Sequence, residues 1–289
     1  MDSIFEKITK AINDFLMSVI ESSLSTMFND VNEKVGTIAA EVGKTPQQWN
    51  ASVFSIIQTL SENVILPIAG LIITFILCYE LITMITEKNN MHDIDTWMFF
   101  KYFFKMWVAV YLVSHTFDIT MAVFDLAQYA VNQASGVIAG STALDIHSVI
   151  TGIDEKLEVM ELSELLVLTL ETMIVSFGMK LMAVLITVIV YVRMIEIYLY
   201  TSVAPIPFAT MSNREWGQIG TNYLKGLFAL AFQAFLIMVC VAIYAVLVSG
   251  IQKSDNISTA LFGIMAYTVV LCFSLFKTGS LAKSIFGAH

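Results

Sequence analysis

Apolar runs of about twenty residues are the feature that most limits the folds open to this chain. A helix needs about 20 consecutive, mostly apolar residues to cross the hydrocarbon core of a bilayer. Five runs approach that length, near residues 64–85, 106–124, 172–192, 226–248 and 258–276. With 57% of its residues hydrophobic and only 13% charged, the chain differs from an ordinary soluble domain. We therefore expect an all-α polytopic membrane protein with about five transmembrane helices.

The second run is the weakest of the five because His115 and Asp118 interrupt it. Residues three apart share a helix face, so these two side chains could form a hydrogen bond. A proton relay would need such a pair to face a wet path through the membrane. A local ion pair or an interface contact is the simpler interpretation. We keep His115 and Asp118 as a candidate intramembrane polar pair.

The amino-terminal region, residues 1–60, has a different pattern. Apolar residues from Ile4 to Ile38 recur at helical spacing, which predicts one long amphipathic helix or two in series. Such a helix could lie on the bilayer surface or pack against a partner or sister subunit. We expect an amphipathic extracytoplasmic region over 1–60 and a transmembrane domain over 61–289.

Between the third and fourth runs lies an apolar segment broken by Pro205 and Pro207. We call residues 194–225 the elbow. Backbone polar groups cannot stay unpaired in hydrocarbon, so a broken helix at a membrane must be buried in protein or line a wet cavity. Proline disfavours helix at the residue before it, which predicts a non-helical turn and an interfacial or re-entrant segment. The alternative is that the prolines merely end a helix.

Charged and aromatic residues gather around this break. Arg193 and Glu196 are three apart, and an Arg at the centre of a span would cost about 2.5–3.5 kcal/mol, which favours a boundary position. Trp216 could anchor the turn at the membrane interface, while Arg214 and Lys225 would offer positive charge to cargo or to an ATPase. The candidate site at the elbow comprises Arg193, Glu196, Pro205, Pro207, Arg214, Trp216, Asn222 and Lys225.

The distribution of charge predicts the orientation in the cell membrane. Lys and Arg in short loops favour the cytoplasmic side, and cations concentrate in segments 88–105, 193–225 and 277–283. Most acids lie instead in the amino-terminal region and in a loop over 125–171. We expect an extracytoplasmic amino terminus and a cytoplasmic carboxyl terminus. The acidic outer loop is either a solvated helix face or a surface that repels DNA phosphates or receives a basic partner.

The sequence contains no motif of a nucleotide-binding loop, a zinc protease or a serine hydrolase. Its three cysteines lie inside apolar runs, without the spacing of a zinc site or a disulfide framework. Its four histidines do not form a metal site by spacing. We expect no enzyme activity and no cofactor, so any energy source must belong to another subunit.

The chain resembles the TrbL-type polytopic membrane subunit of conjugative type IV secretion systems. The resemblance rests on APIPFATM, EWGQIGTNYLKG and FALAFQAF within residues 193–235 and extends from about residue 64 to the end. It is closest to the versions of integrative conjugative elements in Gram-positive bacteria, since the outer loop is short and a long soluble tail is absent. The resemblance implies a transfer-channel subunit that works with cytoplasmic ATPases and other secretion subunits. Its expected cargo is translocating single-stranded DNA with its relaxase.

Two other function classes remain open from the sequence. A secondary transporter usually has inverted repeats with broken helices in corresponding halves, whereas one proline break is present here. A structural membrane scaffold would organise partners without contacting cargo. A five-span chain with few internal polar contacts and a long amphipathic amino-terminal helix fits a repeated subunit better than a lone pore. We therefore expect a homo-oligomer, most simply a closed ring.

Overall fold

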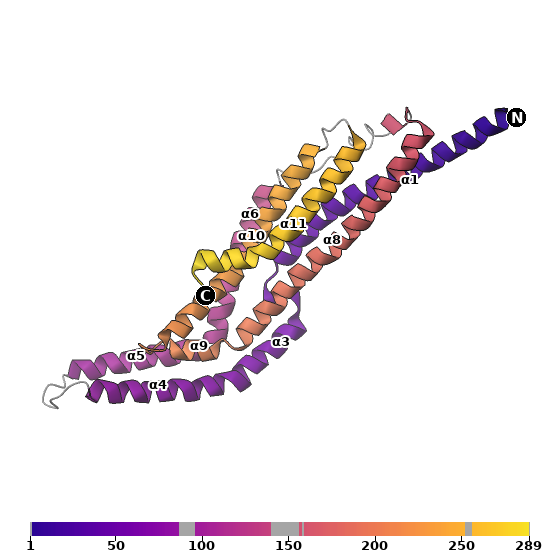
Figure 1. Cartoon of the computed structure of the whole chain (residues 1–289). Coiled ribbons are helices and arrows are strands. Elements are labelled where there is room, and N and C mark those ends of the chain that lie inside the picture. Colours follow the sequence, from indigo (N-terminus) through magenta and orange to yellow (C-terminus); the bar gives the residue numbers. More distant parts are fainter. Residues whose placement is uncertain (1, 87–95, 140–155, 158, 252–255, 289) are drawn as a thin grey trace. The chain divides into compact units, whose positions relative to one another are not determined.

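The computed structural model describes every residue except 1, 87–95, 140–155, 158, 252–255 and 289 (Figure 1). Among the described residues every regular element is a helix. Four helices are long and apolar enough to cross a membrane, and a bent pair of helices raises the number of spans to five if it counts as one. The prediction of an all-α polytopic membrane protein is confirmed.

The first span is longer than its apolar run. It joins α3 (Ala51–Leu60), the π-helical turn η1 (Ser61–Ile65) and α4 (Leu66–Thr86). The helix therefore runs across residue 60, where the sequence suggested the end of the amino-terminal region. The change at that point is a widened turn rather than a break in the helix.

The second run contains the bend between α5 (Thr96–Ser114) and α6 (Thr116–Ala139), which meet at 67°. His115 stands at the bend itself. The three remaining spans are α8 (Leu162–Ser202), α10 (Gly217–Ile251) and α11 (Ile257–Phe286). All three extend beyond their apolar runs because the polar residues at their ends remain helical.

The chain forms two compact units, each built from separate stretches of sequence. Unit 1 contains residues 1–42, 131–190 and 236–277, and unit 2 contains residues 43–130, 191–235 and 278–289. Helices α8, α10 and α11 each contribute one end to each unit.

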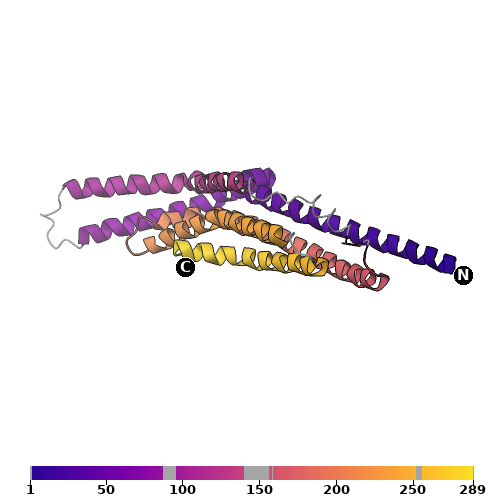
Figure 2. The ribbon, with the colours of Figure 1, turned by 90° about the horizontal axis from the view of Figure 1, so that it is seen from above.

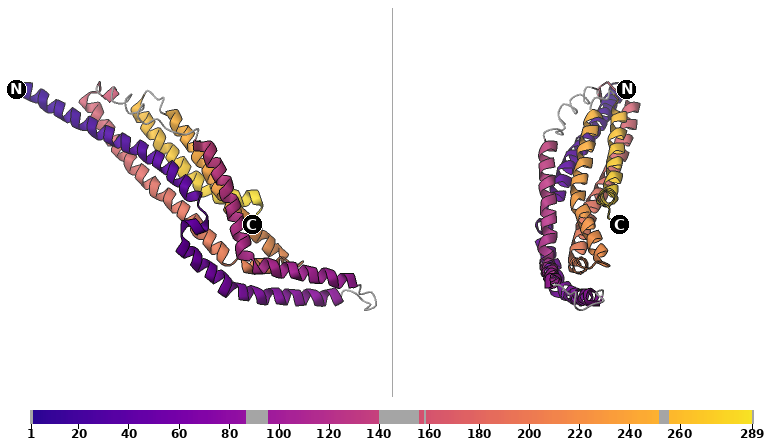
Figure 3. Two further views of the ribbon diagram at one scale, coloured as in Figure 1. Left: turned by 180° about the vertical axis from the view of Figure 1, so that it is seen from behind. Right: turned by 90° about the vertical axis from the view of Figure 1, so that its left-hand side faces the viewer.

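Unit 1 explains the apolar spacing of the amino-terminal region. Its first helix, α1 (Asp2–Val42), buries Leu16, Ile20, Leu24 and Met27, which share one helix face. Part of α1 lies along α8 (Figure 3), and residues of both helices line one small cavity. The amphipathic helix is thus present, and it packs within its own chain.

Unit 2 holds the elbow. It begins with α2 (Pro46–Trp49), whose Thr45 cap and Gln48 exchange side-chain and backbone hydrogen bonds. Tyr198 of α8 donates to the carbonyl oxygen of Pro46 at 2.7 Å. Helices α4 and α5 lie side by side (Figure 2), and α9 (Pro205–Thr210) packs against both. The short α9 is therefore part of the packed core of this unit.

Helices α4 and α5 also carry many exposed apolar side chains. Leu71 is 74% exposed, and Phe75, Phe103, Phe104 and Trp107 are each more than half exposed. A soluble protein rarely exposes such a surface, whereas lipid accommodates it. This exposure fits the membrane assignment.

Candidate functional site at the elbow

The prolines of the elbow end one helix and begin another. α8 ends at Ser202, and after a short turn α9 begins with Pro205 at its first position. Pro207 also lies in the first turn of α9, where backbone N–H groups have no partner within the helix. Neither proline therefore removes a helical hydrogen bond. The turn between α8 and α9 departs less from helical geometry than the sequence predicted, because Ala204 keeps helical φ and ψ angles of −50° and −39°.

A second turn, over residues 211–216, leads into α10. The Oδ1 atom of Asn213 accepts hydrogen bonds from the backbone N–H groups of Glu215 at 2.7 Å and Trp216 at 2.9 Å. Its carbonyl oxygen accepts from the N–H of Gly217 at 2.9 Å. Asn213 thus provides hydrogen-bond acceptors for backbone N–H groups at the start of α10, which have no acceptor within the helix itself. The ring of Trp216 stacks on Phe75 of α4, with ring centroids 6.0 Å apart.

Two tyrosines join the helices on either side of the elbow. Tyr223 of α10 donates to the carbonyl oxygen of Tyr200 at 2.8 Å, and Tyr200 of α8 donates to that of Tyr223 at 3.3 Å. Their rings stack at a centroid distance of 4.5 Å. A Cβ atom at Gly226 would lie 2.1 Å from Tyr200 Oη, so this position requires glycine. We call this arrangement the tyrosine clasp.

A second glycine allows α10 to approach α9. A Cβ atom at Gly220 would lie 2.5 Å from the carbonyl oxygen of Pro207 and 2.1 Å from Met211 Cγ. Sequence reasoning missed the clasp and both glycines. The signal available was two glycines six residues apart in an otherwise bulky helix.

A cleft of about 550 Å³ lies between the end of α4 and the turn over 211–216. Glu80 of α4 pairs through Oε1 with Lys105 of α5, and its Oε2 is buried without a hydrogen-bond partner. Arg214 is exposed beside this cleft and faces a lining that includes carboxylates. The lining residues are Tyr79, Glu80, Thr83, Met84, Asn213, Arg214 and Glu215.

Within the described residues, no hydrogen bond or ion pair joins Arg193 to Glu196. Arg193 is 5% exposed, and its Nε and Nη1 atoms donate no hydrogen bond. Glu196 instead accepts a hydrogen bond from Lys283 of α11 at 3.1 Å, and both of these side chains are about half exposed. The sequence placed Arg193 at a boundary where it could reach solvent, whereas packing buries it in unit 2.

The remaining sequence candidates have no shared site. Asn222 and Lys225 are half-buried on α10. His115 Nδ1 lies 3.0 Å from the carbonyl oxygen of Tyr111, on whose ring it stacks. Asp118 lies exposed in the first turn of α6. No hydrogen bond or ion pair joins His115 to Asp118 in the described part of the chain.

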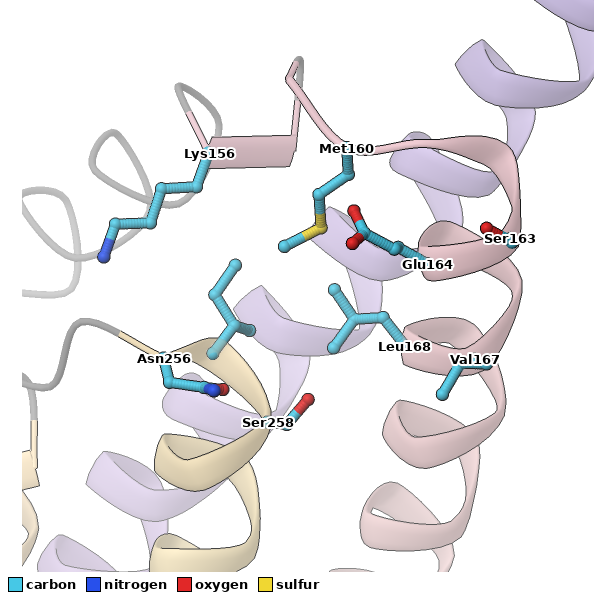
Figure 4. A pocket seen from close by; sticks show the side chains of 9 residues that line it. Lys156, Met160, Ser163, Glu164, Val167, Leu168, Asn256 and Ser258 are labelled. Atoms are coloured by element: carbon cyan, nitrogen blue, oxygen red, sulfur yellow. The ribbon is translucent and has the colours of Figure 1, made fainter.

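Unit 1 contains a separate cavity of about 510 Å³ where α8 and α11 begin (Figure 4). Lys156 and Glu164 line it from one side, and Asn256 and Ser258 from the other. This cavity includes the described end of the acidic outer loop. Half of the acids of the 125–171 loop, at positions 145, 154, 155 and 158, lie outside the described residues. Within the described ranges, no three His, Cys, Asp or Glu side chains gather as they would around a metal ion.

Comparison with protein families gives one match. The family described as TrbL/VirB6 plasmid conjugal transfer like protein matches residues 31–205. The matched range includes Arg193 and Glu196 and ends at Pro205, so the rest of the elbow lies beyond it. No curated protein and no solved structure matches the chain. Because the match covers well over half of the sequence, the chain belongs to the TrbL/VirB6 family of conjugal transfer membrane proteins.

Proposed function

We propose that this chain is a non-catalytic channel or scaffold subunit of a type IV secretion machine. It helps to pass a DNA–protein substrate across the cell membrane, and cytoplasmic ATPases supply the energy. The family match over residues 31–205, in a chain with several spans, is the observation that carries this proposal. We further propose that the subunit assembles with copies of itself and with other secretion subunits.

The proposed orientation places the amino terminus outside and the carboxyl terminus in the cytoplasm. The concentration of cations around the elbow supports it, whereas the hydrogen bond from Tyr198 of the elbow to Pro46 of the region expected outside runs against it. In unit 2, Arg214 lies beside the cleft that Glu80 lines, and Lys105 pairs with Glu80. Lys105 and Arg214 come from segments that the charge distribution assigns to the cytoplasmic side, and Glu80 lies near the adjoining end of the first apolar run. In unit 1, Lys156 of the 125–171 loop and Asn256 of the connection between the fourth and fifth spans line one cavity (Figure 4). With five spans, these two alternate connections lie on the same side of the membrane.

The elbow is the proposed contact with the rest of the machine. Asn213 and the tyrosine clasp hold its turn in one conformation, while Arg214 and Trp216 remain exposed. The cleft beside them presents carboxylates as well as Arg214. A surface for a DNA backbone would be uniformly basic, so this mixed cleft fits a protein partner better. We propose a cytoplasmic ATPase or another secretion subunit as that partner.

Reversal of one charge tests this proposal. Arg214→Glu should lower the frequency of DNA transfer at least tenfold, because a like-charge contact at an interface costs several kcal/mol and tenfold corresponds to about 1.4 kcal/mol. Its amount in the membrane should not change, since Arg214 is exposed. Lys10→Glu makes the same charge change at an exposed position of α1 and serves as the control. Equal transfer by both variants would refute a role for the elbow surface.

A further inference from the structure

Both ends of the helix over Ala51–Thr86 contact the elbow. Just before its start, the carbonyl oxygen of Pro46 accepts the hydrogen bond from Tyr198 of α8 at 2.7 Å. Further along, η1 and α4 pack against α9, and Phe75 stacks on Trp216. The last turns of α4 line the cleft beside the elbow turn. A helix that crosses a bilayer has its ends on opposite sides, so these contacts indicate a helix that stays on one side.

Helix α5 bends sharply away from α6. The two helices have 19 and 24 residues and meet at 67°. Within unit 2, α6 runs alongside α10 (Figures 1 and 3), and Val123 and Phe124 of α6 share a buried cluster with Leu227 of α10. Spans tilt by about 0–40° from the membrane normal. An α6 that crosses beside α10 therefore leaves α5 close to the membrane plane.

One face of α5 carries a row of aromatic side chains. Five of them recur every three or four residues, and each is half exposed or more: Trp97, Phe100, Phe104, Trp107 and Tyr111. We call these five residues the aromatic row. A spanning helix concentrates Trp and Tyr at its two ends, whereas a helix in the membrane interface presents Trp and Phe along one face. The aromatic row follows the second pattern over about 21 Å.

Charged residues lie along the hairpin formed by α4 and α5. Lys105 is in the middle of α5 and pairs with Glu80 of α4. Arg214 and Glu215 line the same cleft as Glu80. If α5 crossed the membrane, Lys105 would lie near the centre of the hydrocarbon core, where an ionised side chain is costly. A hairpin in the membrane boundary keeps these charges close to water.

We propose that α4 and α5 form a re-entrant hairpin in the membrane boundary beside the elbow, with the aromatic row in the lipid headgroup layer. Trp and Tyr rings favour this layer. Lys101 lies with its Nζ 5.7 Å from the centroid of the Trp97 ring and is exposed, so it can reach lipid phosphates. The apolar sides of α4 lie toward the acyl chains.

This placement changes the path of the first apolar run. The run enters the membrane boundary without crossing, and Pro46 lies on the same side as the Tyr198 hydroxyl that it binds. The crossings among the helices after Pro46 are then α6, α8, α10 and α11. The inference goes beyond the proposed function and does not depend on it.

The depths of two tryptophans test this placement. Trp97 and Trp107 are ten residues apart, about 15 Å along the helix axis. Each would be kept as the single tryptophan of the full chain, with phenylalanine at the other three positions, in vesicles that contain brominated phosphatidylcholine. Bromine near the headgroup or near the end of the acyl chains quenches tryptophan at the matching depth. Ile174→Trp and Val184→Trp, ten residues apart at exposed positions of α8, give the spanning control in a background without native tryptophan.

The two native positions should differ in depth by about 6 Å, because α5 lies 67° from α6. The control pair should differ by about 14 Å. Both native tryptophans should be quenched most by the shallow bromine. Deep quenching of Trp107 with shallow quenching of Trp97 would show that α5 crosses the membrane. Absence of quenching at both would show that protein covers the aromatic row, and either result overturns the proposal.

Lysine substitutions give a second test that leaves the tryptophans in place. Phe104→Lys and Val184→Lys introduce the same charge at positions that are 60% and 61% exposed. Lysine on a boundary helix reaches water, whereas lysine within a span is costly. Phe104→Lys should therefore accumulate in membranes like the parent, and Val184→Lys should accumulate less. An equal loss from both substitutions would contradict the boundary placement of α5.

Discussion

At the scale of single residues, the elbow depends on close approaches that only glycine permits. Gly220 lies close to the backbone of α9, and Gly226 lies close to the side chain of Tyr200. The sequence shows these glycines but not their partners, because the partner arrives from another helix. Arg193 illustrates the same limit. Its spacing from Glu196 was visible in the sequence, but the contact of Glu196 with Lys283 and the burial of Arg193 depend on tertiary packing.

Gly226→Ala tests the tyrosine clasp. The added Cβ would collide with Tyr200 Oη, and overpacking of this kind costs about 1–3 kcal/mol. Thermal unfolding of the purified protein should show a lower Tm. Gly70→Ala is the matched control, because no atom lies within 4 Å of its added Cβ and alanine favours helix. Tyr200→Phe combined with Gly226→Ala removes the colliding hydroxyl and should recover part of the loss. Equal Tm values for Gly226→Ala and Gly70→Ala would show that the tyrosine clasp tolerates the added methyl group and is not tightly packed.

At the scale of elements, the apolar runs identified the spans but not their ends. Helices α8, α10 and α11 continue into polar sequence, where hydropathy no longer distinguishes helix from loop. The two prolines correctly marked a break. They did not reveal α9, because proline in the first turn of a helix removes no hydrogen bond.

Replacing Pro205 and Pro207 together with alanine tests the break between α8 and α9. Alanine would let α8 continue as one helix and displace α9 from α4 and α5. We expect lower transfer frequency with little change in membrane insertion, measured by mating assay and by the amount of protein in membranes. Parental transfer by a normally accumulating variant would mean that the prolines only end a helix.

At the scale of the whole molecule, the charge distribution predicts a topology that single-cysteine labelling can test. The background would carry alanine in place of Cys78, Cys240 and Cys272. A cysteine at Glu161 should react with an impermeant maleimide in intact cells, whereas one at Arg214 should react only after permeabilisation. Both positions are exposed. Labelling of both from outside would rule out the proposed orientation.

Contact between the chain and its cargo tests the central claim most directly. Transfer-competent cells would be treated with formaldehyde, and DNA recovered with the immunoprecipitated chain would be measured. A channel subunit should recover the transferred DNA strand well above an unrelated chromosomal sequence, and Arg214→Glu should reduce that recovery. If cells that transfer DNA at the normal frequency yield no cargo DNA above this background, the chain is a scaffold that does not line the path.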